Sequence, residues 1–71
     1  MKNMVHRAIE HMEQDRTRAY TLTELRKAAR IAIRSQYRLS AGLLASEMVV
    51  RGDASKGQAG RYVIAPWLLR D

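Results

Sequence analysis

Apolar residues recur with the spacing of a helix in three segments of the chain. In residues 3–15 they fall on one side of a helix, opposite charged and amide side chains, at Met4, Val5, Ala8, Ile9 and Met12. Residues 22–29 carry a narrower apolar stripe at Leu22, Leu25, Ala28 and Ala29. The third segment, residues 33–46, has a wider stripe that extends just beyond it, at Ile33, Tyr37, Leu39, Leu43, Leu44 and Met48. The pattern predicts three helices that share one core.

The start of the second helix has its own sequence signal. Thr21 and Glu24 have the spacing of a capping box, in which the threonine oxygen accepts from the amide three residues later and the glutamate reaches back to the cap amide. Tyr20 and Leu25 have the spacing of a hydrophobic staple around that cap. We therefore predict a helix that begins just after Thr21, with Tyr20 available for a single short strand pairing before it.

The pattern changes after the third helix. Residues 48–51 and 61–64 are short runs rich in branched and aromatic side chains, and the loop between them contains Gly52, Gly57 and Gly60. Two such runs around a glycine-rich loop predict a β-hairpin over residues 48–64, which Pro66 ends. No linker or internal repeat interrupts the chain, so residues 1–71 are predicted to form one domain.

The order of these elements resembles a known family. Residues 24–39 resemble the helix-turn-helix core of winged-helix transcription regulators, with Glu24 and Leu25 near the start of a short helix that leads to a turn and a recognition helix. Residues 43–51 look like that family's passage into the first wing strand, and residues 60–64 look like its returning strand. The resemblance implies a mainly α fold with a small β-hairpin, a winged helix-turn-helix of three helices and a two-stranded wing.

The chain departs from the family's pattern at two places. Winged-helix regulators often have glycine in the turn and serine or threonine at the cap of the recognition helix, whereas this chain has Arg30 and Ala32 there. A left-handed backbone at Arg30 would cost about 1 kcal/mol, so Ser35 is an alternative cap for the third helix. Gly42 lies inside that helix, where it either allows a close approach of another element or marks a break near Ser40.

The charge of the chain favours a polyanionic partner. Thirteen Lys and Arg residues against seven Asp and Glu give a formal net charge of +6 in 71 residues, and such a density attracts nucleic acids over long range. There is no cysteine, which excludes disulfides and thiolate metal sites. The sequence shows neither a signal peptide nor a membrane-spanning run of about 20 apolar residues. A cytoplasmic location is therefore expected.

The resemblance, together with side-chain chemistry, identifies candidate DNA contacts. Arginine pairs bidentately with guanine and glutamine with adenine, so the predicted base contacts on the third helix are Arg34, Ser35, Gln36 and Arg38. Cations at the end of the second helix and around the wing are placed to meet phosphates, which position a protein without reading sequence. These predicted phosphate contacts are Lys27, Arg30, Lys56 and Arg61. Each of these residues has the alternative role of an ordinary solvated side chain.

Catalysis and metal binding are not expected. His6 and Glu10 are four residues apart, but His11 lies about 100° around the helix from Glu10, and the spacing is not that of a zinc protease. No nucleophile, base and orienting acid can be assembled from the sequence. We therefore expect a protein that is not an enzyme and that uses no metal, cofactor or small-molecule substrate.

Three functional hypotheses remain at this point. The first is a small transcription regulator that binds duplex DNA through the third helix and the wing, with a homodimer as one way to gain affinity. The second is a winged-helix adaptor that binds protein, such as a phage-encoded factor that docks on host RNA polymerase and alters initiation or termination. Its contact surface could include Trp67, Leu68 and Leu69, which alternatively cap the core. The third is an RNA- or ribosome-associated protein.

Overall fold

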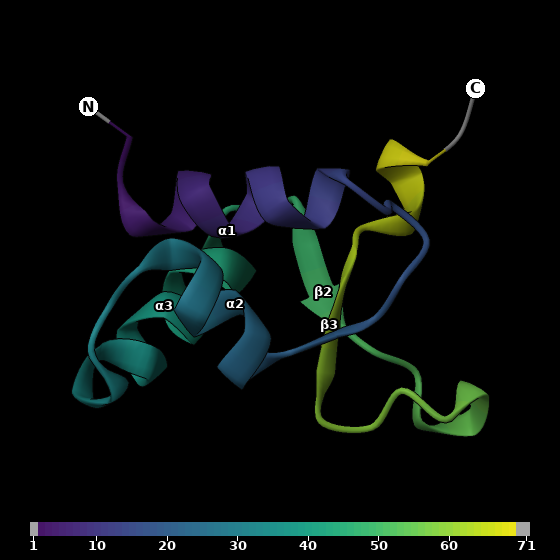
Figure 1. The fold of residues 1–71 in the computed structure, drawn as a ribbon. Helices are drawn as coiled ribbons and strands as arrows, with labels where there is room; N and C mark the ends of the chain where they lie inside the picture. The colour runs from purple at the N-terminus through teal and green to yellow at the C-terminus, as the bar shows by residue number, and fades with distance from the viewer. Residues whose placement is uncertain (1, 70–71) are drawn as a thin grey trace.

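A computed structural model describes residues 2–69 and contains three helices and a small antiparallel sheet (Figure 1). The helices and strands, in chain order, are α1 (Met4–Glu13), β1 (Tyr20–Thr21), α2 (Leu22–Ala29), α3 (Gln36–Ala45), β2 (Val49–Arg51) and β3 (Arg61–Ile64). Three single turns of 3₁₀-helix connect or follow them, namely η1 (Ile33–Ser35), η2 (Ala54–Lys56) and η3 (Pro66–Leu68). No helix within residues 2–69 is both long and apolar enough to cross a lipid bilayer.

The sheet has three strands in the order β1-β3-β2, which corrects the expected two-stranded hairpin. Both pairings are antiparallel, with Tyr20 opposite Tyr62 and Val50 opposite Val63. The hairpin of β2 and β3 is confirmed, and the short pairing foreseen for Tyr20 adds the third strand. Because β1 leads directly into α2, this pairing joins the helical part of the fold to the sheet.

The first two helices bury the faces that the sequence predicted. Asn3 caps α1 by accepting a hydrogen bond from the amide of His6 at 2.9 Å, and Thr21 caps α2 by accepting from the amide of Glu24 at 3.1 Å. The predicted capping box is only half formed, because the carboxylate of Glu24 pairs with Arg18. The buried residues of the two helices are Ala8, Ile9, Met12, Leu25 and Ala29.

The third helix differs from its prediction in extent and in phase. A single helix over residues 33–46 is replaced by the turn η1 followed by α3. Its buried apolar side chains are Leu39 and Leu43, and the predicted core residues Ile33, Tyr37 and Met48 are exposed. Leu39 lies about 200° around a helix from Tyr37, so the two side chains cannot both face the core. The expected wide stripe was therefore wrong.

Two contacts fix the orientation of α3. Gly42 lies against α1, since a Cβ atom there would stand 2.7 Å from Cγ2 of Val5, which identifies the glycine as a point of close approach and not a break. On β3, the hydroxyl of Tyr62 lies 2.6 Å from the hydroxyl of buried Ser40. The helix is thus held between α1 and the sheet.

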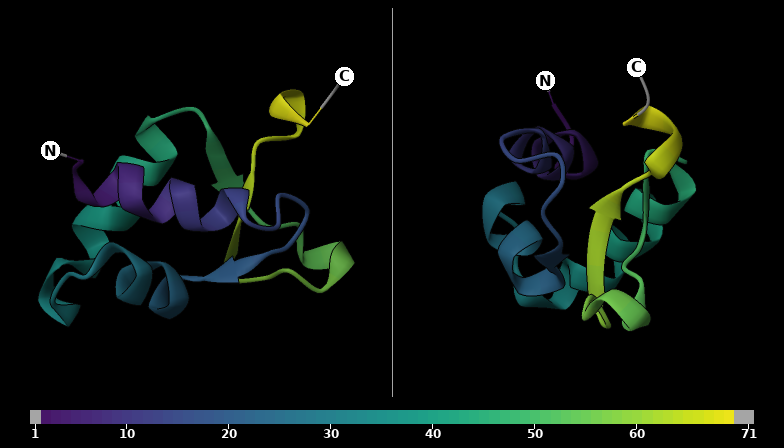
Figure 2. Two further views of the ribbon diagram at one scale, coloured as in Figure 1. Left: turned by 45° about the horizontal axis from the view of Figure 1, so that its top comes forward. Right: turned by 90° about the vertical axis from the view of Figure 1, so that its right-hand side faces the viewer.

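The arrangement leaves two segments on the side of the molecule opposite α1. In Figure 1, α1 runs along the top, while the connection from α2 to α3 lies at the lower left and the β2–β3 loop (residues 52–60) at the lower right. The right-hand view of Figure 2, turned about the vertical axis, keeps both segments at the bottom. The start of α3 and the tip of the hairpin therefore face the same way.

Candidate nucleic-acid interface

The turn between α2 and α3 is held by arginine side chains from two helices. Arg7 on α1 donates through Nε to the carbonyl of Ala29 at 2.8 Å, and Arg26 on α2 donates to the carbonyl of Ile31 at 3.1 Å. Arg30, which lies between Ala29 and Ile31, takes the left-handed conformation, with φ 59° and ψ 44°. That conformation costs about 1–2 kcal/mol for a residue with a side chain. The expected turn therefore forms without glycine. Its carbonyls at Ala29 and Ile31 are held by hydrogen bonds from side chains of α1 and α2.

The side chains at the start of α3 do not all face outward. Arg34 and Arg38 are exposed, as the base-contact prediction requires, whereas Ser35 and Gln36 are half-buried. Ser35 occupies the cap position of α3, but its side chain makes no capping hydrogen bond. The four predicted base contacts are therefore two exposed arginines and two half-buried residues that lie between them in the sequence.

Two apolar residues accompany these arginines on the surface. Ile33 is 66% exposed and Tyr37 is 76% exposed. Sequence reasoning missed them as surface residues because their spacing matched a buried stripe. The signal that could have separated them is the competing pair of Leu39 and Leu43, which are four residues apart and define a different face.

Free cations gather around this segment. Between residues 25 and 46 the sequence has five Lys or Arg residues and no Asp or Glu. Of these five, Arg26 is used in the turn, and the other four make no side-chain hydrogen bond or ion pair with any other part of residues 2–69. They are Lys27, Arg30, Arg34 and Arg38, and all four are exposed.

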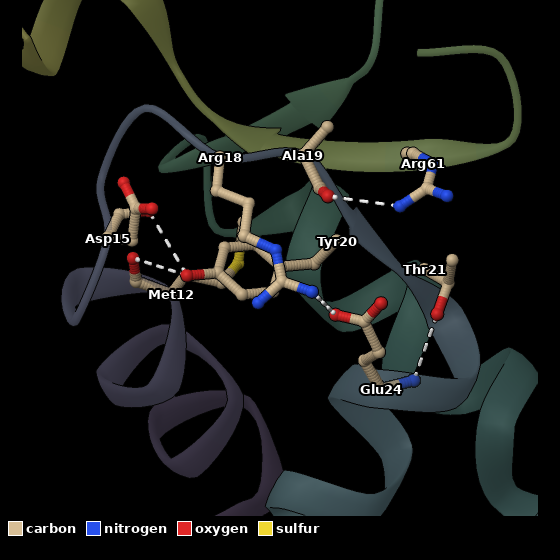
Figure 3. A network of polar contacts seen from close by, with 8 residues as sticks. All are labelled: Met12, Asp15, Arg18, Ala19, Tyr20, Thr21, Glu24 and Arg61. Atoms are coloured by element: carbon tan, nitrogen blue, oxygen red, sulfur yellow. Dashed lines mark hydrogen bonds and ion pairs between the residues drawn. The ribbon is translucent and has the colours of Figure 1, made fainter.

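The cations near α1 and β1 are instead paired. Arg16 contacts Glu13 at 3.1 Å, and Arg18 contacts Glu24 at 2.9 Å while its guanidinium lies 4.8 Å from the ring centre of Tyr20 (Figure 3). Figure 3 also shows Arg61, whose Nη1 donates to the carbonyl of Ala19 at 3.3 Å. Arg61 is half-buried, so this predicted phosphate contact is already engaged inside the fold.

The β2–β3 loop is organised by its own polar groups. The carboxylate of Asp53 accepts hydrogen bonds from the amide and the hydroxyl of Ser55. The amide of Asp53 donates to the side-chain oxygen of Gln58, and the amide of Gln58 donates to the carbonyl of Asp53. The exposed Lys56 belongs to this loop in η2. Arg51, which sequence reasoning did not select, is exposed at the end of β2, with its guanidinium 5.8 Å from the ring centre of Tyr62.

The order of this loop is expected to depend on pH. Hydrogen bonds from the Ser55 hydroxyl and then its amide lower the pKa of Asp53 below its usual value, with a smaller contribution from the charge of Lys56. The ionised carboxylate therefore stabilises the loop. This stabilisation is fully present above the usual pKa of an aspartate and is lost as the pH falls through the lowered pKa of Asp53. The protection of the Ser55 amide, measured as its exchange rate in an unstructured peptide divided by its rate in the protein at the same pH, should fall in that range. In Asp53→Ala this protection should be low at every pH, and protection that is high and independent of pH in both proteins would contradict the assignment.

A shallow hollow lies on another part of the surface. It measures about 210 Å³ and is lined from the α1–β1 connection, the β2–β3 loop, β3 and η3 by Arg16, Thr17, Lys56, Gln58, Val63, Ile64, Pro66 and Leu69. Lys56 thus borders this hollow. Of the predicted protein interface, Leu68 packs against the core, while Leu69 and Trp67, at 55% exposure, are on the surface.

The two histidines of α1, His6 and His11, were considered above as metal ligands. His11 lies with its ring centre 5.4 Å from that of Tyr20, in an edge-on arrangement. His6 is exposed on the same helix. Among residues 2–69, no group of three or more His, Cys, Asp or Glu side chains is placed to hold a metal ion.

Comparison of the chain with protein-family models, with curated protein sequences and with solved structures gives no significant match.

Proposed function

We propose that this protein is a small transcription regulator of the winged-helix type that binds duplex DNA through the start of α3. The observation that carries the proposal is a set of four exposed cations, from the end of α2 to the start of α3, that make no side-chain hydrogen bond or ion pair within residues 2–69, namely Lys27, Arg30, Arg34 and Arg38. They lie on both sides of and within the α2–α3 turn, where the carbonyls of Ala29 and Ile31 accept from Arg7 and Arg26. A run of exposed cations with no acidic residue between positions 25 and 46 is typical of a nucleic-acid-binding surface.

The shape of this region suits the major groove of DNA. The groove is wide enough to admit an α-helix, and the first turn of α3 exposes Tyr37 and Arg38. Arg34 and Arg38 are placed to donate to base edges, for which arginine and guanine form the commonest specific pair. Lys27 near the end of α2 and Arg30 in the turn precede them and are suited to phosphates beside the groove. Ser35 and Gln36, which are half-buried, would make a smaller contribution to the contact.

The β2–β3 loop would act as the wing. It lies on the same side of the molecule as the start of α3 (Figures 1 and 2), and it carries Lys56, with Arg51 at its base. Arg61 would instead support the hairpin through Ala19. Because one module of this size buries only about 600–1,000 Å² on DNA, tight binding would call for a second copy on an adjacent half-site.

The experiment that tests this function is selection from a randomised duplex pool at two salt concentrations. Phosphate contacts alone weaken steeply as salt rises, whereas base contacts add affinity for particular sequences. Enrichment of one sequence that persists at the higher salt is the expected result. Retention that disappears with salt and enriches no sequence would show that the net charge alone attracts DNA, and it would contradict the proposal.

A second candidate function is a protein-binding adaptor, for example one that docks on RNA polymerase. It is favoured by two exposed residues near the C-terminal end of the described chain, Leu69, which lines the hollow, and Trp67. Aromatic side chains of this exposure often anchor protein interfaces. Retention of RNA polymerase by the protein, lost in Trp67→Ala and kept in Tyr37→Ala, would favour the adaptor. Failure of the unsubstituted protein to retain RNA polymerase would exclude the adaptor function.

A further inference from the structure

The two most exposed large apolar side chains of residues 2–69 lie beside the free cations. These are Ile33 and Tyr37, which we call the apolar pair, and both are more exposed than Trp67. They are four residues apart, in η1 and the first turn of α3, which places them near each other on the helical segment. Adjacent large apolar groups on a rigid element are typical of a contact surface.

The neighbouring positions narrow down what this surface can contact. Arg34 and Arg38 lie next to the apolar pair in sequence, and the exposed positions that follow on α3 are Ala41 and Ala45. Alanine side chains are single methyl groups, so this side of α3 can approach a partner closely. No acidic residue occurs between positions 25 and 46 to repel an anionic partner. The surface therefore combines apolar contact, cations and close access.

We infer that Ile33 and Tyr37 contact the C5-methyl groups of thymines in the major groove. Thymine presents this methyl group at its major-groove edge, where it is contacted by apolar side chains. The neighbouring cations favour DNA over an apolar protein surface as the occupant, because a partner must offer negative charge beside an apolar contact. The inference rests on the proposed DNA-binding function and adds a preference for thymine opposite the start of α3.

Deoxyuridine provides a direct test, since it differs from thymidine only by the missing methyl group. One randomised duplex pool is prepared in a thymine and a uracil version, which are tagged, mixed in equal amounts and presented to the protein. Sequencing of the retained duplexes gives the ratio of the two versions. The expected ratio for the wild-type protein is about fourfold in favour of thymine for each methyl group contacted, the factor that burial of one carbon provides.

Single substitutions then assign the preference to residues. Ile33→Ala and Tyr37→Ala should each lower the ratio toward one, while both variants still retain duplexes through their arginines. Both side chains are exposed, so neither change should disturb folding. Trp67→Ala is the matched control, because it removes an exposed aromatic side chain from another part of the surface. It should keep the wild-type ratio.

The other outcomes would overturn the inference in distinguishable ways. A wild-type ratio of one, with particular sequences still enriched, would refute thymine contact and leave the DNA-binding function standing. Failure to retain either version at the higher salt would refute that function and the inference together. If the wild-type protein is dimeric in sedimentation, Tyr37→Ala is monomeric and the ratio is unchanged, the apolar pair joins two copies of the chain.

Discussion

Replacing Arg34 and Arg38 by alanine, singly, is expected to weaken binding to the enriched duplex by about 5- to 150-fold each, which corresponds to about 1–3 kcal/mol per bidentate base contact. Both side chains are exposed and make no hydrogen bond or ion pair with other described residues. Their removal should therefore leave folding unchanged. Discrimination between the enriched duplex and an unrelated one should fall as well, because base contacts carry the sequence information.

The matched controls for these variants are Arg16→Ala and Arg18→Ala. They make the same change in net charge, but Arg16 and Arg18 are paired with Glu13 and Glu24 on another part of the molecule. Binding measured by fluorescence anisotropy should change little in these controls. Lys27→Ala should weaken binding to all duplexes alike and reduce the slope of log K against log salt by about one. Equal losses in all five variants would mean that net charge, and not the start of α3, determines binding.

Replacing Tyr20 by alanine is expected to destabilise the fold by about 3–5 kcal/mol, the usual effect of deleting a buried aromatic ring. Tyr20 is only 2% exposed, and its hydroxyl donates to the carbonyl of Asp15 at 3.1 Å, with the carbonyl of Met12 at 3.4 Å (Figure 3). It thereby joins the end of α1 to β1. A 71-residue domain has roughly 4–11 kcal/mol of stability in total, so much of it would be lost.

Two further variants distinguish the contribution of the buried ring from that of its hydroxyl and from the effect of removing an exposed tyrosine. Tyr20→Phe keeps the ring and removes the hydrogen bonds, with an expected loss of about 0.5–1.5 kcal/mol. Tyr37→Ala makes the same substitution at an exposed site and should change stability by no more than about 0.5 kcal/mol. Urea unfolding measures all three. A similar loss for Tyr20→Ala and Tyr37→Ala would contradict the placement of the two tyrosines.

Features that depend on neighbouring residues could be predicted from the sequence. The cap at Thr21, the apolar faces of α1 and α2 and the glycine-rich hairpin each follow from patterns within a few residues. The left-handed turn at Arg30 shows the limit of such patterns. The local cost of that conformation is offset in part by a hydrogen bond from Arg7 to the carbonyl of Ala29, which is 22 residues away from Arg7 along the chain.

Features set by distant contacts could not be predicted in the same way. The phase of α3 depends on the contact of Gly42 with Val5 and on the hydrogen bond of Ser40 with Tyr62. Without these contacts, the apolar residues on the two sides of α3 are equally good candidates for the core. For the same reason Arg61 was predicted to be available to phosphates, although the pairing of β1 with β3 brings it to the carbonyl of Ala19.

If duplex DNA binds at the start of α3, as we propose, amide chemical shifts mapped by NMR as the enriched duplex is added should locate the contact there. We expect the largest changes in residues 30–38, smaller changes in the β2–β3 loop, and little change in α1, which lies on the opposite side (Figure 1). Changes concentrated in α1 or around Trp67, with residues 30–38 unaffected, would contradict it.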